Sequence, residues 1–429
     1  MSLSKEEERR QAAELLKSIQ NSEGVEEEKK QAAELLKAIK NEERKEAEKR
    51  QAIDLLKTFE NKERVLLSTN PKNSQSDSSF QSGPKQKSTN YPSRKQSKKI
   101  LKGFIEKLSH VGKAEGLGDF STKKFFGGIK KQYSEEDVVN TLFVGTASTT
   151  PNINAITTQY PEPWLFLRLI IASVILFYGF VFLFNQSENP NLIPGIIFSG
   201  SFAIPISTLV LFFELNIRRN VPFWTVMRVL LAGAILSFFI TQILLSNTSD
   251  IFSTTGAWSA ALLEEPAKLI ALIILTRGKR KYPYILNGLL LGAAVGCGFA
   301  TFESAGYALN NLAIDGVESM ISIIQLRGVL SPFMHIIWTA VAGAALWRVQ
   351  RDGSFYIGLL KKKEFYEPFR AIIICHVIWN SGLLYRIPFY GGYIFIGLIA
   401  WILALSLVNL GIKQIADEKA GKQIFKTIK

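Results

Sequence analysis

Beyond residue 163 the sequence is a succession of apolar segments, each long enough to cross a lipid bilayer as a helix. A helix rises about 1.5 Å per residue, so about 20 apolar residues cover the hydrocarbon core. The sequence predicts eight such spans, at 164–184, 192–213, 223–246, 255–276, 284–309, 328–349, 366–385 and 391–411. We therefore expect an all-α polytopic membrane protein whose membrane domain covers residues 163–412.

The positive charges between these spans predict the orientation of the membrane domain. They gather in the loops of one side, at 218–219, 277–281 and 348–363, and in the tail 413–429. The loops of the opposite side contain only Arg327 and Arg386. Because Lys and Arg mark cytoplasmic loops, we expect a multi-pass cell-membrane protein with both termini in the cytoplasm. The formal net charge of +14 then reflects contact with the lipid bilayer and topology, and we expect no nucleic-acid partner.

The polar head of the chain opens with a repeat. QAAELLK at 11–17 recurs at 31–37 and, as QAIDLLK, at 51–57. At about 100° per residue, a period of 20 residues falls about 200° away from a whole number of turns. We therefore expect three short amphipathic helical repeats over residues 1–66, which either bind a protein partner or form a solvated tail.

Two further segments join the repeats to the membrane domain. Residues 67–98 lack hydrophobic periodicity and are expected to form a disordered linker. Residues 99–162 are expected to form a small cytoplasmic segment beside the membrane, beginning with a basic amphipathic stretch that suits a lipid surface. Within it, Ser134 is the expected N-cap of a helix. Residues 413–429 are expected to form a basic cytoplasmic tail.

Ionisable and amide side chains interrupt four of the predicted spans. They are Glu264, Glu265 and Lys268 in the fourth, Glu303 in the fifth, His335 in the sixth, and His376 with Asn380 in the seventh. A charge at the centre of a membrane helix costs about 2.5–3.5 kcal/mol, so each of these residues needs compensation. Counted along each helix, the carboxylates and imidazoles agree in depth within about 5 Å. The sequence therefore predicts one shared polar site in the middle or outer half of the bilayer.

Spacing within the spans supports this expectation. Glu264 and Lys268 are i,i+4 neighbours and are expected to pair, whereas Glu265 points about 100° away. Small residues at every fourth position from Gly288 to Ala308 permit close helix approach and draw Glu303 inward. Pro332 removes a helical hydrogen bond and frees a carbonyl group just before the sixth-span histidine.

Histidines and carboxylates in one buried site fit several kinds of chemistry. In a hydrolytic zinc site, imidazoles and one carboxylate bind the ion while a second carboxylate takes a proton from water. Without a metal, a glutamate activates the water, and His and Asn stabilise the oxyanion. Buried Glu, His and Lys also suit a proton-coupled transporter. The residues alone leave these alternatives open.

Four motifs in order resemble the PrsW family of intramembrane proteases. They are EEPAK at 264–268, FATFE at 299–303, SPFMHIIWTAVAG at 331–343 and CHVIWN at 375–380. FFELNIRRNVP after the second span is also similar to that family, and the resemblance covers residues from about 160 to 411. CAAX-type prenyl endopeptidases, and ABI-type membrane proteases with them, are more distantly similar. Leu269 and Glu303 stand where the CAAX pattern has Arg and His, although the spacing of His376 and Asn380 fits it.

The resemblance implies a membrane-embedded endopeptidase, classed as a metalloprotease, in a prokaryotic cell membrane. Typical substrates of the family are membrane-anchored regulatory proteins such as anti-sigma factors. Zn²⁺ is the ion that this reading implies, and which of the two adjacent glutamates is the base stays open. The matching motifs place the catalytic roles on Glu264, Glu265, Lys268 and Asn380, and the metal-binding or oxyanion-stabilising roles on Glu303, His335 and His376.

Overall fold

The computed structural model describes residues 94–252, 257–277, 282–351 and 353–423. The predicted repeats at 1–66, most of the predicted linker 67–98 and the end of the tail lie outside the described residues. The described chain belongs to one compact unit, Asn90–Lys429. It is built from helices with no β-strand in the ranges given above, as the apolar pattern predicts.

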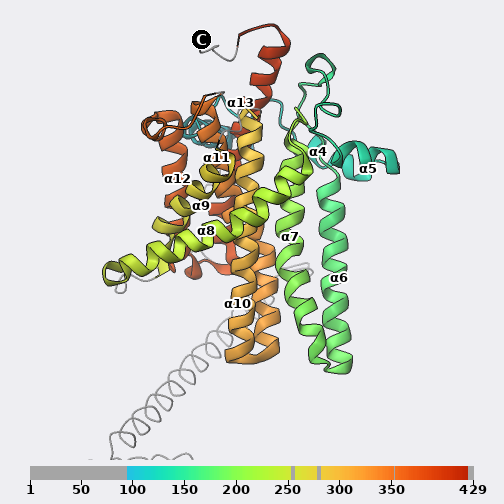
Figure 1. Ribbon diagram of the computed structural model, residues 1–429, viewed down its shortest axis with the longest axis vertical. Helices are drawn as coiled ribbons and strands as arrows, with labels where there is room; N and C mark the ends of the chain where they lie inside the picture. Colours follow the sequence, from blue (N-terminus) through green and yellow to red (C-terminus); the bar gives the residue numbers. More distant parts are fainter. Residues whose placement is uncertain (1–93, 253–256, 278–281, 352, 424–429) are drawn as a thin grey trace, which may run out of the picture. The chain divides into compact units, whose positions relative to one another are not determined.

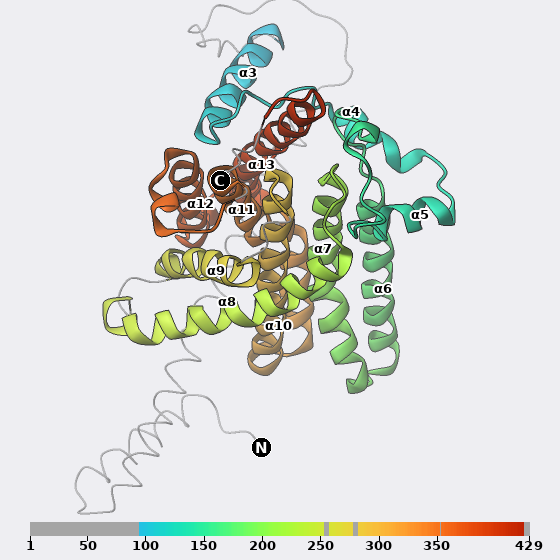
Figure 2. The ribbon, with the colours of Figure 1, turned by 45° about the horizontal axis from the view of Figure 1, so that its top comes forward.

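The helices of the membrane domain follow one another with short connections (Figure 1). They are α6 (Leu165–Ser187), α7 (Ile193–Leu215), α8 (Phe223–Phe252), α9 (Ala260–Thr276), α10 (Ile285–Leu330), α11 (His335–Gln350), α12 (Lys363–Asn380) and α13 (Gly391–Lys419). Helices α6, α7 and α10 stand side by side, and their lower ends extend beyond α9, α11 and α12. Figure 2 shows α8 and α9 packed together across α10.

Five segments of the described chain are long and apolar enough to cross a membrane: Leu165–Ser187, Pro190–Leu215, Phe223–Thr248, Ile285–Gln350 and Gly391–Lys419. The predicted number of eight spans is therefore not confirmed. The predicted fourth span is the 17-residue α9, and the predicted seventh is the 18-residue α12, which begins with the charged sequence KEFYEPFR. The predicted fifth and sixth spans belong to one long segment.

That long segment is a hairpin followed by a helix break. Gly316 has φ 84° and ψ −172°, a conformation that glycine adopts at least cost, and it turns α10 back on itself. The return arm, residues 317–330, ends at a single turn of 3₁₀ helix, Ser331–Phe333, directly before α11. The carbonyl group of Pro332 accepts a hydrogen bond from Trp401 Nε1 at 3.0 Å. The expected break before His335 is thus confirmed, and Trp401 of α13 satisfies the carbonyl group of Pro332 within that break.

Glycines on α10 allow α11 to approach its backbone. A Cβ atom at Gly288, Gly292 or Gly296 would lie 2.6, 2.3 and 2.3 Å from backbone oxygens of α11, the last of them the carbonyl oxygen of His335. The small-residue pattern of the sequence therefore marks a real contact, which holds the start of α11 against α10.

Replacing Gly296 with Val should destabilise the protein by at least about 2 kcal/mol, because the new side chain must displace backbone rather than a flexible side chain. Thermal unfolding in detergent measures the change. Gly306→Ala is the matched control, because a Cβ there has no neighbouring atom within 4 Å and alanine favours helix. A G296V variant that unfolds at the wild-type temperature would contradict the close approach.

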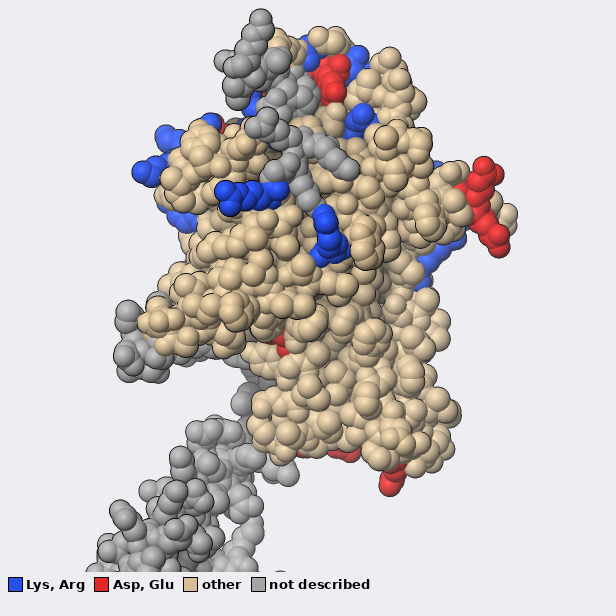
Figure 3. Space-filling view, viewed as in Figure 1, with Lys and Arg blue, Asp and Glu red and all other residues tan. Residues whose placement is uncertain are grey.

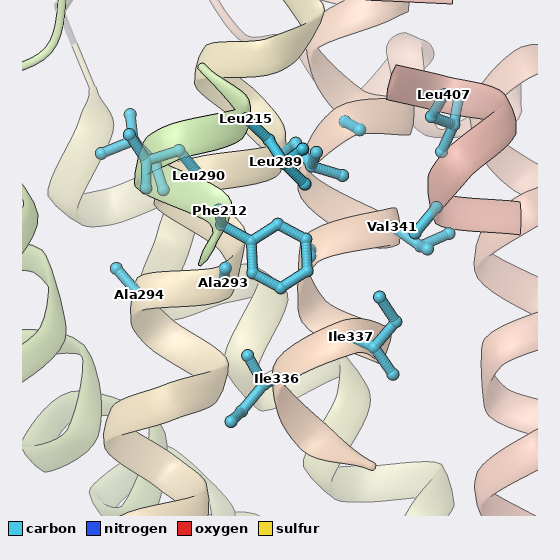
Figure 4. Close-up of a cluster of buried hydrophobic side chains, with 14 of the residues drawn as sticks. Phe212, Leu215, Leu289, Leu290, Ala293, Ala294, Ile336, Ile337, Val341 and Leu407 are labelled. Carbon is cyan, nitrogen blue, oxygen red and sulfur yellow. The ribbon is translucent and has the colours of Figure 1, made fainter. Parts of the chain in front are cut away.

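The apolar core lies where α7, α10, α11 and α13 meet. Figure 4 shows the buried side chains that fill it: Phe212, Leu215, Leu289, Leu290, Ala293, Ala294, Ile336, Ile337, Val341 and Leu407. Large apolar side chains on α6 and α8, such as Ile175 and Phe239, are instead more than half exposed and suit contact with lipid. In Figure 3, Lys and Arg lie in the upper part of the described surface, a few acidic atoms lie at its lower edge, and the surface between them is largely uncharged.

The side of the bundle that we expect in the cytoplasm is held by backbone capping. Glu214, at the end of α7, accepts hydrogen bonds from the N–H groups of Trp164, Leu165 and Phe166 at 2.8, 2.9 and 3.0 Å. These donors have no partner within their own helix, so Glu214 acts as the N-terminal cap of α6.

The segment that precedes the membrane domain carries three helices, α3 (Arg94–Val111), α4 (Thr122–Phe125) and α5 (Glu135–Leu142). Ser134 caps α5 in a reciprocal capping box with Asp137, as expected. The basic amphipathic stretch forms α3, where Ile100 and Leu101 are exposed. Its contact with lipid headgroups stays a prediction.

Candidate hydrolytic site

All seven residues that the sequence singled out meet in one place, contributed by α9, α10, α11 and α12. Glu264 is the fifth residue of α9, His335 is the first residue of α11, and His376 lies four residues before the end of α12. Three of the four helices therefore begin or end at the site. The predicted spans extended five residues further at the start of α9 and at the end of α12, and the structure corrects those boundaries. The prediction that these residues come together in one polar cluster is confirmed by their contacts.

Lys268 lies at the centre of the site and is completely buried. Its Nζ is 2.5 Å from Glu265 Oε1 and 2.8 Å from His335 Nδ1. The distance from Nζ to Glu264 Oε2 is 4.0 Å, so the closer carboxylate is the i,i+3 neighbour rather than the expected i,i+4 neighbour. The ammonium also lies 4.4 Å from the centroid of the Phe299 ring. Ion pairing and the aromatic face together compensate this buried charge.

His376 is oriented by Glu265. Its Nδ1 is 2.8 Å from Glu265 Oε1, and a carboxylate accepts, so Nδ1 donates and Nε2 keeps its lone pair. Asn380 Nδ2 lies 3.2 Å from that Nε2 and donates to it. Nε2 of His376 is also 3.7 Å from Glu264 Oε2. The lone pair of His376 therefore accepts from Asn380, on the side of the ring that lies near Glu264.

His335 follows the same rule with a different glutamate. Its Nε2 lies 2.9 Å from Glu303 Oε2, so Nε2 donates and Nδ1 accepts from the ammonium of Lys268. The two imidazole rings cross at 78° with their centroids 5.0 Å apart. Each histidine is therefore held by one carboxylate, a device that fixes ring orientation and tautomer.

Glu264 is the glutamate that holds no histidine by a hydrogen bond. Its Oε2 is buried and has no hydrogen-bond partner. Glu265 also has one unpartnered oxygen, but its other oxygen binds both Lys268 and His376. A buried carboxylate oxygen without a donor is costly, and a water, a proton or an ion would complete it. Glu264 and Glu265, which the sequence alone does not distinguish, therefore have different surroundings.

Three of these side chains could together hold a metal ion, provided that Lys268 and Asn380 release the imidazole lone pairs that they occupy here. In the described part of the chain, Glu264, His335 and His376 can each offer a ligand atom such that these atoms lie within 4.8 Å of one another. Two imidazoles and one carboxylate are a common set for catalytic zinc. The sequence placed Glu303 in this set. In the structure the carboxylate of Glu303 already meets Arg327 and His335.

Arg327 is the residue that reasoning from the sequence missed. We placed it in an outer loop, but it lies in the return arm of α10, and its guanidinium pairs with Glu303. A signal was present, because the segment ISIIQLRGVL at 321–330 is otherwise uncharged. If residues 321–330 are taken as part of a membrane helix, Arg327 is a charge within the membrane and needs a partner.

Comparison with known proteins agrees with the motifs and the site. Residues 221–408 match the model of a family described as PrsW family intramembrane metalloprotease. This range contains every site residue and excludes α6 and α7, so it is shorter at its start than the resemblance read from the motifs. Searches of curated proteins and of solved structures found no match. Over residues 221–408, this chain is therefore similar to the PrsW family of intramembrane metalloproteases.

Proposed function

We propose that this membrane protein is an endopeptidase that hydrolyses peptide bonds of membrane-anchored proteins, with Glu264 contacting the reacting water. The observation that carries the assignment is the buried oxygen of Glu264, which has no hydrogen-bond partner while the other two glutamates each hold a histidine. The family match supports an intramembrane peptidase.

The reaction needs one base and one site for a developing oxyanion. Glu264 takes a proton from the water, the water oxygen bonds to the scissile carbonyl carbon, and the carbonyl oxygen becomes an oxyanion. The side-chain amide of Asn380, at the open end of α12, donates to that oxyanion. Glu264 then gives its proton to the amide nitrogen, the C–N bond breaks, and a carboxylic acid and an amine leave.

The remaining site residues support these two. Glu265 and Glu303 orient the histidines, and Lys268 supplies the positive charge that keeps carboxylates stable in a buried site. This arrangement divides the three glutamates into one reactive group and two orienting groups.

The residues that would hold Zn²⁺ are Glu264, His335 and His376. When bound, the ion supplies a Lewis acid that polarises the carbonyl and makes a bound water more acidic. Because a carboxylate has two oxygens, Glu264 can bind an ion through one and accept a proton through the other.

Metal analysis of the purified protein tests this donor set. We expect about one zinc ion per chain, and we expect His376→Ala and His335→Ala each to lower the zinc content by at least about tenfold, because each removes a ligand. Glu214→Gln, in the cap of α6, is the control and should keep the metal. Equal zinc in all variants would show that the ion is bound elsewhere and that the glutamate works without it.

The substrate and orientation are part of the proposal. We infer a prokaryotic cell membrane, both termini in the cytoplasm, and substrates among membrane-anchored regulatory proteins such as anti-sigma factors. The repeats at 1–66 would bind a protein partner or the substrate itself. The positive loops support the orientation, and the family match supports a protease that works in the membrane.

The reaction class is tested with purified protein in lipid vesicles that also contain labelled single-span proteins. We expect cleavage within or beside the spanning segment by the wild type and none by Glu264→Gln. Two outcomes would favour the other readings. Uptake of solute driven by a pH gradient, with no cleavage, would indicate a transporter, and cleavage restricted to prenylated C-termini would indicate CAAX-type activity.

A further inference from the structure

Arg327 is a charged side chain in an apolar arm, and only 14% of it is exposed. Its partners lie on the other arm of the same hairpin. The guanidinium pairs with Glu303 Oε2, and its Nε donates to Ser304 Oγ at 2.9 Å. The Cζ atom lies 4.4 Å from the centroid of the Tyr307 ring. Arg327 therefore joins the two arms of α10 at the level of the site.

The oxygen of Glu303 that meets Arg327 is also the oxygen that meets His335. Oε2 lies 2.9 Å from the imidazole Nε2. A carboxylate held by a guanidinium has little freedom to rotate, so the direction in which it accepts from His335 is fixed. Nδ1 of that ring is then left facing Lys268 at 2.8 Å. Arg327 acts on the ring only through Glu303.

Arg327 also changes the charge balance of the site. The site holds three glutamates and Lys268, which lies closest to Glu265. Arg327 adds a second positive charge, and its partner is Glu303. Because buried charges are stable only when compensated, this pairing leaves Glu264 as the carboxylate with no cation in hydrogen-bonding contact. Because Arg327 pairs with Glu303 and Lys268 pairs with Glu265, the two orienting glutamates each have a cation and Glu264 does not.

We propose that Arg327 is a positioning residue for hydrolysis in this site, which holds Glu303 against His335 and so fixes the orientation of that imidazole. The inference rests on the proposed function and deepens it. It differs from a purely structural clamp between the arms, because a clamp would act on folding and not on the rate of the chemical step.

The test is a double-mutant cycle between Arg327→Met and Glu303→Gln. Loss of a partner that orients a ligand commonly reduces activity by about 10–100-fold, so we expect kcat of R327M to fall by that factor with KM nearly unchanged. In the Glu303→Gln background we expect Arg327→Met to have little further effect on kcat, because the group through which it acts is already altered. Unchanged kcat in R327M, or equal losses in both backgrounds, would overturn the proposal.

Two further variants separate folding from positioning. Ser319→Ala removes another hydrogen bond between the arms, from Ser319 Oγ to Asn311 Oδ1 at 2.9 Å, and should leave kcat unchanged. Should R327M not fold, Arg327→Lys keeps the charge but loses the fork that reaches both Glu303 and Ser304, and kcat should still fall by about fivefold or more. A fully active R327K would contradict the proposal that Arg327 positions Glu303. Cleavage by Glu264→Gln would instead refute the proposed function.

Discussion

Glu264→Gln should lower the cleavage rate by about 10³-fold or more while leaving the fold intact. Glutamine has the size of glutamate but cannot take a proton, and general bases contribute about 10²–10⁴-fold. Because Oε2 of Glu264 has no hydrogen-bond partner, the substitution removes a buried negative charge and breaks no hydrogen bond of that oxygen. The variant should therefore be as stable as the wild type or more so. Cleavage of a labelled single-span protein and thermal unfolding in detergent measure the two effects.

Glu265→Gln is the matched comparison. It loses an acceptor that binds Lys268 at 2.5 Å and His376 at 2.8 Å, so both activity and stability should fall. The pair of adjacent glutamates should therefore separate into a variant that is stable and inactive and a variant that is both unstable and inactive. Wild-type cleavage by E264Q would show that Glu264 does not contact the water.

Lys268→Met should destabilise the protein by about 3–5 kcal/mol, the usual cost of breaking a buried ion pair from one side. The side chain is completely buried, and its loss leaves Glu265 without its cation. Chemical or thermal unfolding of the purified protein measures the change. The double variant Lys268→Met, Glu265→Gln should recover part of the lost stability, because it removes the uncompensated charge.

The control for this prediction is Lys113→Met. Lys113 forms an ion pair with Glu367 at 2.7 Å, but both side chains are partly exposed, at 36% and 23%. Exposed pairs contribute about 0–1 kcal/mol, so this variant should unfold almost as the wild type does. If both lysine variants lost the same small amount of stability, the site would be far better hydrated than its burial indicates.

The identity and common depth of the site residues could be predicted from the sequence because membrane helices admit few charges. Glu264, Glu303, His335 and His376 stood out against apolar surroundings, and a straight helix with a fixed rise places them in depth. The glycine pattern of α10 and the break at Pro332 could likewise be predicted, since each is visible in the local sequence of one segment.

The parts that could not be predicted depend on contacts between segments. Hydropathy does not show that α10 turns at Gly316 and returns, so Arg327 was placed in a loop and its partner was missed. The predicted fourth span began five residues before α9, and the predicted seventh span ended five residues after α12, because apolar residues such as Trp258 and Leu384 lie just beyond these helices. Whether Lys268 pairs with Glu264 or Glu265 depends on side-chain torsions and on the position of His335, 67 residues further along the chain.

The contact between α10 and α11 has a consequence for what the site can cut. Glycines let the backbones of the two helices touch, so the start of α11 packs directly against α10. For the hydrolysis proposed above, we expect the start of α11 to keep its position and the substrate to change its conformation. A peptide group inside an intact helix has its carbonyl oxygen already bonded, so the segment to be hydrolysed must first unwind. We therefore expect segments with low intrinsic helix stability to be cleaved faster than segments with high helix stability. Glycine, proline or β-branched residues near the scissile bond should favour cleavage.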